Sequence, residues 1–235
     1  MSADRGDTWK DISSNIPDSP VNALAEDKYN KNLLFAGTDN GLYVSLDGGT
    51  GWEVFQSGIP NVAVHDLVLQ DDARHLLAGT HGRSIYQADI AILQQMKENV
   101  LQSELFVFNL PDILHSTKWG NPSNAWIQPD TPGLDITFFS GQNTSYTAKV
   151  MTADGVVVSS ATLDAVRGLN ILSYDLAFSK KGKSDYLKKY KRELQQAKNG
   201  KTYLPTGNYV VEIIGDGLTE KTSFTINDKD PDTKE

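Results

Sequence analysis

Short apolar stretches alternate with polar residues and end in turn-forming residues throughout the first 90 positions of the chain. Alternation over about four to eight residues is typical of half-buried β-strands. The pattern predicts strands at 9–12, 21–25, 33–38, 42–45 and 52–55, and then at 62–69, 75–80 and 84–87. The N-terminal region is therefore expected to be all-β and to consist of small antiparallel sheets.

The same pattern occurs twice along this region. Ile16-Pro17 recurs 43 residues later as Ile59-Pro60, and Ala36-Gly37-Thr38 recurs 42 residues later as Ala78-Gly79-Thr80. A repeat of this length is typical of one four-stranded propeller blade. About two blades are expected, against about four to eight in a closed propeller. Two blades alone leave sheet edges open, and open edges favour pairing with a second chain, so an oligomer is one expectation. The chain is expected to be the C-terminal portion of a larger protein or an unusual truncated form, and its blade edges are open in either case.

Each repeat also contains one octapeptide of the form S-x-D-x-G-x-x-W. Glycine supplies the positive φ of a tight turn, and an aspartate carboxylate can accept bonds from the backbone N–H groups of its own turn. A tryptophan ending the turn can pack between neighbouring sheets. A lone carboxylate lacks the partner that glycoside hydrolysis requires, so a structural role is favoured over a catalytic one. The residues with this expected structural role are Ser2, Asp4, Gly6, Thr8, Trp9, Ser45, Asp47, Gly49 and Trp52.

The octapeptides resemble the Asp-boxes, or BNR repeats, of sialidases, sortilin-type receptors and xyloglucan-hydrolysing propellers. The run from Ala78 to Tyr86 is similar to the sequence that closes sortilin-like propellers of exported bacterial proteins. This chain has Gly51 where the box usually has threonine, and Ser84 and Tyr86 where the closing sequence usually has glycine and tryptophan. The resemblance implies a propeller fold and export to a bacterial periplasm or cell surface.

A different pattern begins after residue 90. Apolar residues at helical spacing predict a helical linker over 91–104, and a second all-β domain is expected over 105–228. Its expected strands are 105–109, 124–128, 134–140, 146–151, 156–158, 169–176, 209–214 and 221–226. Short strands in this number, separated by turns, predict an immunoglobulin-like sandwich. The region also resembles the Ig-like domain of flagellar hook-capping proteins, on the landmarks Asp154-Gly155, Gly168-Leu169-Asn170, Tyr174-Asp175-Leu176 and 204–209.

A lysine-rich segment, 179–201, interrupts the sandwich. Tyr186, Leu187, Tyr190 and Leu194 recur at helical spacing, which predicts a short amphipathic helix. Its basic residues either form a solvated helix face, the favoured interpretation, or contact an anionic partner such as an acidic polysaccharide or lipid headgroups. The acidic tail over 229–235 is expected to be disordered.

Composition limits the possible functions. The formal net charge of −8 argues against general nucleic-acid binding, because counterion release requires an excess of positive charge. No apolar stretch is long enough for a transmembrane helix. The absence of cysteine excludes disulfides and thiol catalysis. No cofactor, metal ligand or catalytic residue is assigned.

Four polar residues of the second repeat are candidates for ligand binding: His65 and Asp66 on a predicted inner strand, and His81 and Arg83 in a loop at a blade rim. Arginine can hold a carboxylate with two parallel bonds, although these residues can equally lock the last blade to its neighbour. Three functions stay open: a non-catalytic scaffold or binding portion, which is favoured; a fragment of a carbohydrate-active enzyme with its catalytic carboxylates upstream; and a sortilin-like module that binds a peptide or protein. The expected ligand is accordingly a carbohydrate or a protein.

Overall fold

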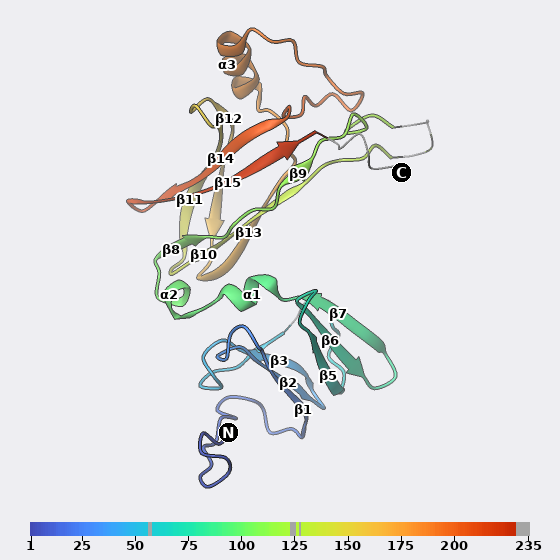
Figure 1. Ribbon diagram of the computed structural model, residues 1–235, viewed down its shortest axis with the longest axis vertical. Helices are drawn as coiled ribbons and strands as arrows, with labels where there is room; N and C mark the ends of the chain where they lie inside the picture. Colours follow the sequence, from blue (N-terminus) through green and yellow to red (C-terminus); the bar gives the residue numbers. More distant parts are fainter. Residues whose placement is uncertain (56–57, 123–125, 127, 229–235) are drawn as a thin grey trace. The chain divides into compact units, whose positions relative to one another are not determined.

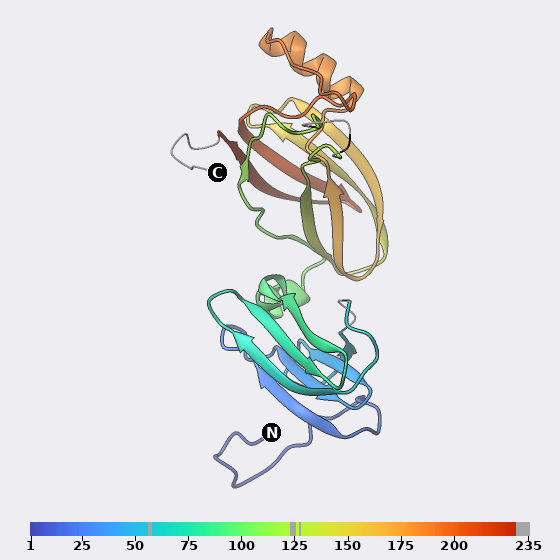
Figure 2. The same ribbon diagram turned by 90° about the vertical axis from the view of Figure 1, so that its right-hand side faces the viewer.

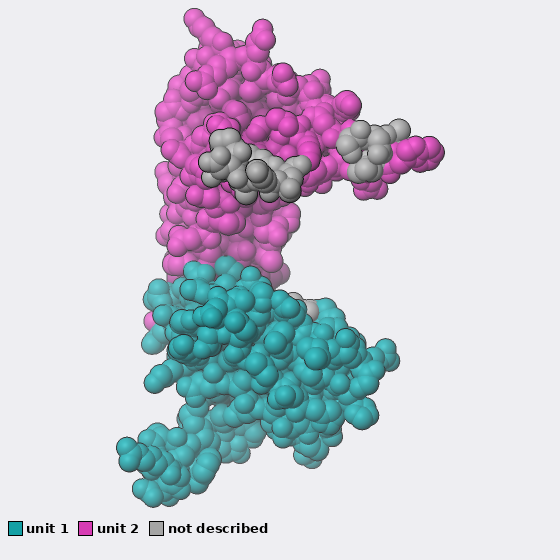
Figure 3. Space-filling model, turned by 45° about the vertical axis from the view of Figure 1, so that its right-hand side comes forward, with its two compact units in different colours: residues 1–101 teal, residues 102–235 magenta. Residues whose placement is uncertain are grey.

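Figure 1 shows a computed structural model of the chain, which describes residues 1–55, 58–122, 126 and 128–228. Strands dominate, so the all-β expectation is confirmed. The chain forms two compact units, Met1–Leu101 and Gln102–Glu235, which Figure 3 distinguishes by colour. The predicted strand over 124–128 falls largely on residues outside those described, and the tail over 229–235 lies wholly outside them.

The first unit contains two antiparallel sheets. The first sheet has the strand order β1-β2-β3-β4, with β1 at Val21–Glu26, β2 at Leu34–Thr38, β3 at Gly41–Ser45 and β4 at Glu53–Val54. The second sheet has the order β5-β6-β7, with β5 at Val64–Gln70, β6 at His75–Thr80 and β7 at Ser84–Asp89. These seven strands match seven of the eight predicted from the alternation. The β3–β4 and β6–β7 turns contain glycines of positive φ, Gly48, Gly49 and Gly82.

The two sheets enclose a common core. It contains residues of the first sheet and its flanks and residues of the second: Leu33, Phe35 and Leu42, and Val64, Leu76, Ala78 and Ile90. The backbones approach closely at Gly37, where an added Cβ would lie 2.8 Å from Val64 Cγ1 and 2.9 Å from the Val64 carbonyl oxygen. Real Cβ atoms do not come this close to their neighbours. Glycine at this position therefore permits the two sheets to pack.

The predicted strand over 9–12 is wrong: these residues form no strand in the structure. The Ile12 carbonyl and the backbone of Trp52 bond to side chains and not to a neighbouring strand. The Ile12 carbonyl accepts the Trp52 indole N–H at 2.7 Å, and the Asn15 side chain bonds both the N–H and the carbonyl of Trp52, at 2.8 Å each. Ile12 and Ile16 pack on the outer face of the first sheet against Leu34, Ala36, Tyr43 and Trp52.

Two short helices follow β7: α1 at Ala91–Gln95 and α2 at Glu98–Leu101. Both belong to the first unit, although the sequence suggested one helical linker over 91–104. Gln94 donates its amide to the buried Asp27 carboxylate at 2.7 Å, and Asn30 donates to the Met96 carbonyl at 3.1 Å. These buried bonds fasten the helical segment to the loop after β1.

The second unit contains two sheets and one longer helix. One sheet has the order β13-β10-β8 and the other the order β12-β11-β14-β15-β9, in which only the pair β15 and β9 is parallel. The strands are β8 (Leu105–Val107), β9 (Ile113–Leu114), β10 (Leu134–Ser140), β11 (Thr144–Thr152), β12 (Val157–Ala165), β13 (Gly168–Tyr174), β14 (Gly207–Gly215) and β15 (Leu218–Asn227). The alternation did not predict β9, because two residues are too short to show a period.

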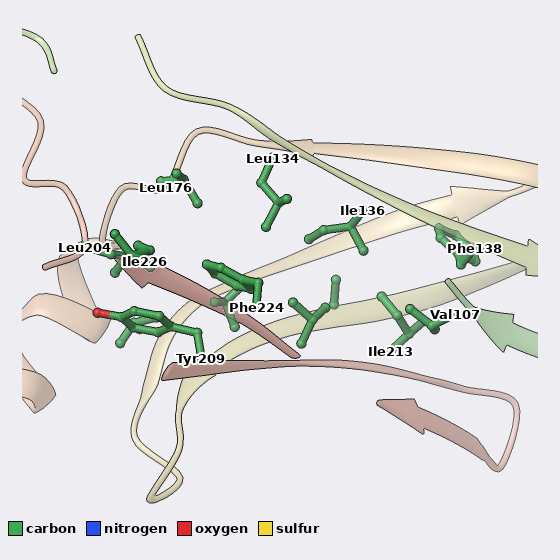
Figure 4. Packing of buried hydrophobic residues seen from close by; sticks show 14 of the residues in the cluster. Val107, Leu134, Ile136, Phe138, Leu176, Leu204, Tyr209, Ile213, Phe224 and Ile226 are labelled. Carbon is green, nitrogen blue, oxygen red and sulfur yellow. The ribbon is translucent and has the colours of Figure 1, made fainter. Parts of the chain in front are cut away.

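The core of the second unit lies between its two sheets. Figure 4 shows side chains of β10, such as Ile136 and Phe138, in the same cluster as Tyr209, Ile213 and Phe224 of the other sheet. Every second residue of β11 and of the middle of β14 is buried, as the alternating sequence predicts for strands with one covered face.

The lysine-rich segment forms the helix α3 at Lys180–Tyr190, which lies at one end of the second unit's sheets (Figures 1 and 2). Ser179 caps its first turn by accepting the Gly182 N–H at 3.0 Å. Gly182 is buried on β12, where an added Cβ would lie 1.9 Å from the Val158 carbonyl oxygen. The helix ends at Tyr190 and is followed by Lys191, whose backbone is left-handed at φ 51°. The predicted helical position of Leu194 is therefore wrong, because the left-handed residue turns the chain before it.

Candidate functional site

The first octapeptide forms a turn closed by its own side chains. Ser2 Oγ donates to Asp4 Oδ1 at 2.8 Å and accepts the Gly6 N–H at 2.6 Å, while Asp4 Oδ1 accepts the Thr8 N–H at 2.9 Å. The Thr8 hydroxyl donates to Asp4 Oδ2 at 2.6 Å. Reciprocal bonds between Met1 and Lys10, at 2.7 and 2.8 Å, close the base of the turn.

The second octapeptide repeats the bonds that its serine and aspartate make within the turn. Ser45 Oγ donates to Asp47 Oδ1 at 2.8 Å and accepts the Gly49 N–H at 2.8 Å, and the Gly51 N–H donates to Asp47 Oδ1 at 2.8 Å. Gly51 has no side chain to supply the hydroxyl bond that Thr8 makes in the first turn. In both turns the aspartate carboxylate therefore accepts hydrogen bonds from the backbone of its own turn.

The two tryptophans have different surroundings. Trp52 is 4% exposed in the cluster over the first sheet, whereas Trp9 is 76% exposed. The indole of Trp9 donates within its own turn, to the Gly6 carbonyl at 3.1 Å. The expectation that both rings pack between sheets is thus wrong for Trp9, because the residues after it form no strand for the ring to cover.

Hydrogen bonding shifts the acidity of the first turn. The Thr8 hydroxyl, followed by the Thr8 N–H and the Ser2 hydroxyl, lowers the pKa of Asp4 from 3.8 to about 2. The cause is that each of these donors favours the ionised carboxylate. An aspartate with so low a pKa is ionised at neutral pH, which suits an acceptor in a turn and not a proton donor.

The candidate ligand-binding residues lie at one end of the second sheet. His65 occupies a β-bulge at the start of β5, where the register shifts between Val64 and Asp66. His81 is in the hairpin after β6, and its ring meets that of His65 edge to face at 5.5 Å between centroids. Both histidines are exposed. The structure thus brings together two residues that are 16 positions apart in the sequence.

Asp66 and Arg83 are exposed at the same end of the sheet. The Asp66 carboxylate accepts the N–H of Leu67 at 2.9 Å through one of its two oxygens. Arg83 lies in the β6–β7 hairpin, two positions after His81. The hairpin therefore carries two of the four candidates, and β5 carries the other two.

The first sheet has an equivalent pair of residues that the sequence analysis missed. Asn22 occupies the matching bulge in β1, between Val21 and Ala23, and donates to Asp39 of the β2–β3 hairpin at 2.8 Å. Asn22 precedes His65 by 43 residues and Asp39 precedes His81 by 42, which are the offsets of the repeat. Those offsets were the signal that could have identified Asn22 and Asp39.

The two pairs adjoin each other. Asn22 also donates to the carbonyl of Val64, the residue before His65, at 3.3 Å. We call Asn22, Asp39, His65 and His81 the bulge rim. Bulges re-aim side chains and are frequent beside functional sites. The rim offers amide, carboxylate and imidazole groups, which can hydrogen-bond the hydroxyl groups of a sugar or the backbone of a peptide.

The chain matches no protein-family model and no curated protein sequence. Its structure is similar to the extracellular domain of the putative one component system BT4673 from B. thetaiotaomicron, with 13% identity and a TM-score of 0.25 over 89% of this chain and 25% of that chain. The extracellular domain described as that of the putative hybrid two component system BT4673 gives 12% identity and a TM-score of 0.26 over 92% of this chain and 26% of that one. The chain thus spans about a quarter of the length of these proteins.

Among the described residues, no helix has the length and apolar character needed to cross a membrane.

Proposed function

We propose that this chain is a non-catalytic binding portion of an exported protein: two blades of an Asp-box propeller followed by an Ig-like domain, with a ligand held at the bulge rim. The observation that carries the proposal is the bulge itself. It recurs in both sheets at the same repeat position and places a polar side chain beside a polar hairpin residue each time.

The propeller interpretation is supported by the hydrogen bonds of the two turns and by the way the sheets pack. Asp4 and Asp47 accept equivalent bonds 43 residues apart, and the sheets that carry the repeat share one core. In this interpretation both aspartates stabilise turns. The Ig-like interpretation is supported by the two sheets of the second unit, which are antiparallel except for the β15–β9 pair, and by the alternating burial of β11 and β14.

Binding at the rim is supported by its chemistry and accessibility. The two repeats carry different side chains at equivalent positions: an amide and a carboxylate in one, two imidazoles in the other. Arg83 adds a cation to the same hairpin as His81 and has no hydrogen bond or ion pair with any other described residue. A carbohydrate or peptide with both donors and acceptors would be complementary to this set.

The test is to probe the whole chain with a glycan array and a random peptide library. Hits are then titrated against His65→Ala, His81→Ala and Arg83→Ala. The matched control is His75→Ala, since His75 lies at the opposite end of β6 and bonds Gln87 at 2.7 Å. The proposal predicts at least a tenfold loss of affinity in a rim variant and less than a twofold change in the control.

Two results would contradict the proposal. Turnover of a glycoside by this chain, abolished by Asp66→Asn alone, would assign it to a carbohydrate-active enzyme. If the rim variants lower thermal stability and leave every hit bound as before, His81 and Arg83 lock the sheets together instead of binding a ligand.

A further inference from the structure

A second candidate site lies in the second unit and is independent of the rim. A shallow pocket of about 240 Å³ lies where the end of α3 meets the β11–β12 turn and the start of β14. Its lining includes three tyrosines, one arginine, one amide and one carboxylate: Tyr186, Tyr190, Tyr209, Arg192, Asn208 and Asp154.

The tyrosines are held in fixed orientations. The rings of Tyr186 and Tyr190 lie 4.4 Å apart, and Tyr209 stacks on Phe224 at 5.4 Å. The Tyr209 hydroxyl donates to the Pro205 carbonyl at 2.8 Å. Tyr186 and Tyr209 are buried, whereas Tyr190 is half-buried. Tyr190 is therefore the ring that a ligand in the pocket would contact.

The carboxylate of the pocket is already paired. Asp154 accepts bonds from Lys189 at 2.6 Å, from the Thr152 hydroxyl at 2.7 Å and from the Tyr190 hydroxyl. These donors, Lys189 first, hold the pKa of Asp154 well below its usual range. They also fix the Tyr190 ring. Because Lys189 neutralises Asp154, this carboxylate opposes an anionic ligand only weakly.

The arginine of the pocket is not paired in this way. Arg192 directly follows the left-handed Lys191, which ends α3. Within the described part of the chain, its guanidinium group and the amide nitrogen of Asn208 form no hydrogen bond or ion pair. The segment 179–201 contains nine basic residues but only two acidic ones, Asp185 and Glu193, in a chain of net charge −8. The local charge thus favours an anion at the pocket.

We propose that this pocket binds a sugar unit that carries a carboxylate, such as a uronic acid of an acidic polysaccharide. Arg192 holds the carboxylate with two parallel N–H bonds, and the exposed part of the Tyr190 ring packs on the apolar face of the sugar. Asn208 and Thr206 bond the sugar hydroxyls. Aromatic surface beside a cation distinguishes this ligand from a plain inorganic anion, which would gain nothing from the ring.

The probe is an oligogalacturonate of three to four units, titrated into the full chain by calorimetry. Arg192→Gln is expected to weaken binding at least tenfold. The matched control is Lys180→Gln, which removes the same charge from the same segment at the other end of α3 and is expected to change affinity less than twofold. The methyl ester of the same oligosaccharide is expected to bind at least tenfold more weakly than the acid. Arg192 is exposed, so its replacement leaves the fold intact, and circular dichroism checks this.

Several results would overturn the proposal. Equal losses in the two variants would show that the lysine-rich surface attracts anions without using the pocket. Equal binding of the acid and its ester would show that Arg192 does not recognise the carboxylate. If the acid does not bind at millimolar concentration, the pocket is not a site for this sugar. Tighter binding to vesicles of anionic phospholipid, with the same dependence on Arg192, would assign the pocket to lipid headgroups.

Discussion

Replacing Gly37 by alanine would place a methyl group between the two sheets of the first unit. The new Cβ would lie 2.8 Å from Val64 Cγ1 and 2.9 Å from the Val64 carbonyl oxygen. The methyl of Val64 could shift at small cost, but the carbonyl belongs to β5 and can move only with the strand. Overpacking of this kind costs about 1–3 kcal/mol.

Gly79→Ala is the matched control, because Gly79 occupies the same place in the second repeat. Its new Cβ would lie 3.5 Å from Asp66 Cβ, an ordinary contact with a neighbour in its own sheet. Alanine would also restrict the unfolded chain, which adds up to about 1 kcal/mol of stability where the backbone is compatible. We therefore expect the two variants to differ in unfolding free energy by about 2 kcal/mol, with Gly37→Ala the less stable.

The assay is native-state hydrogen exchange measured by mass spectrometry, which reports each sheet separately. Gly37→Ala should raise exchange in peptides covering β2 and β5 together, by roughly 30-fold for 2 kcal/mol if the sheets open as one. Peptides covering β11 and β14 of the second unit are the internal reference and should not change. Equal effects of the two variants, or faster exchange in β2 alone, would refute the packing of successive repeats.

Three further predictions test individual contacts. Gly182→Ala should detach α3, because no side chain fits against the Val158 carbonyl. In urea denaturation it should lower the unfolding free energy of the second unit by more than about 2 kcal/mol. An unchanged unfolding free energy would show that α3 does not pack on β12 at this position. Thr8→Ala should raise the pKa of Asp4 from about 2 towards 3.8, followed by NMR titration of the carboxyl group. Because the folded pKa lies below the unfolded one, the ionised form stabilises the first turn above about pH 4, and this contribution should be lost as the pH falls through about 2. Trp52→Phe should lower the unfolding free energy of the first unit by about 1–3 kcal/mol through the loss of the buried indole bond, and no change in chemical denaturation would contradict the role assigned to Trp52.

The strands could be predicted because their signals are local. The alternation of apolar and polar residues placed β1 to β7 within about two residues of their bounds, and the repeat offset relates equivalent positions in the two sheets. The failure at 9–12 has a different origin: whether a segment joins a sheet depends on a partner strand. Here the side chain of Asn15 and the indole of Trp52 take the bonds that a strand would have made.

The candidate site was predictable in part. His65 stood out as a polar residue on a predicted inner strand and His81 as one in the loop at a blade rim. Asn22 and Asp39 become candidates only when the repeat aligns the bulges of β1 and β5. The pocket beside α3 could not be found from the sequence, because Tyr190 and Asp154 are 36 residues apart and meet only through the packing of the helix.

The most direct test of the account compares Asp47→Ala with His81→Ala on both stability and binding. The account predicts opposite outcomes: Asp47→Ala lowers the melting temperature and leaves the affinity of the folded protein for its array ligand unchanged, while His81→Ala leaves the melting temperature unchanged and lowers the affinity at least tenfold. If Asp47→Ala instead abolished ligand binding or turnover without any loss of stability, the aspartate of the turn would be a functional group and the account would be wrong.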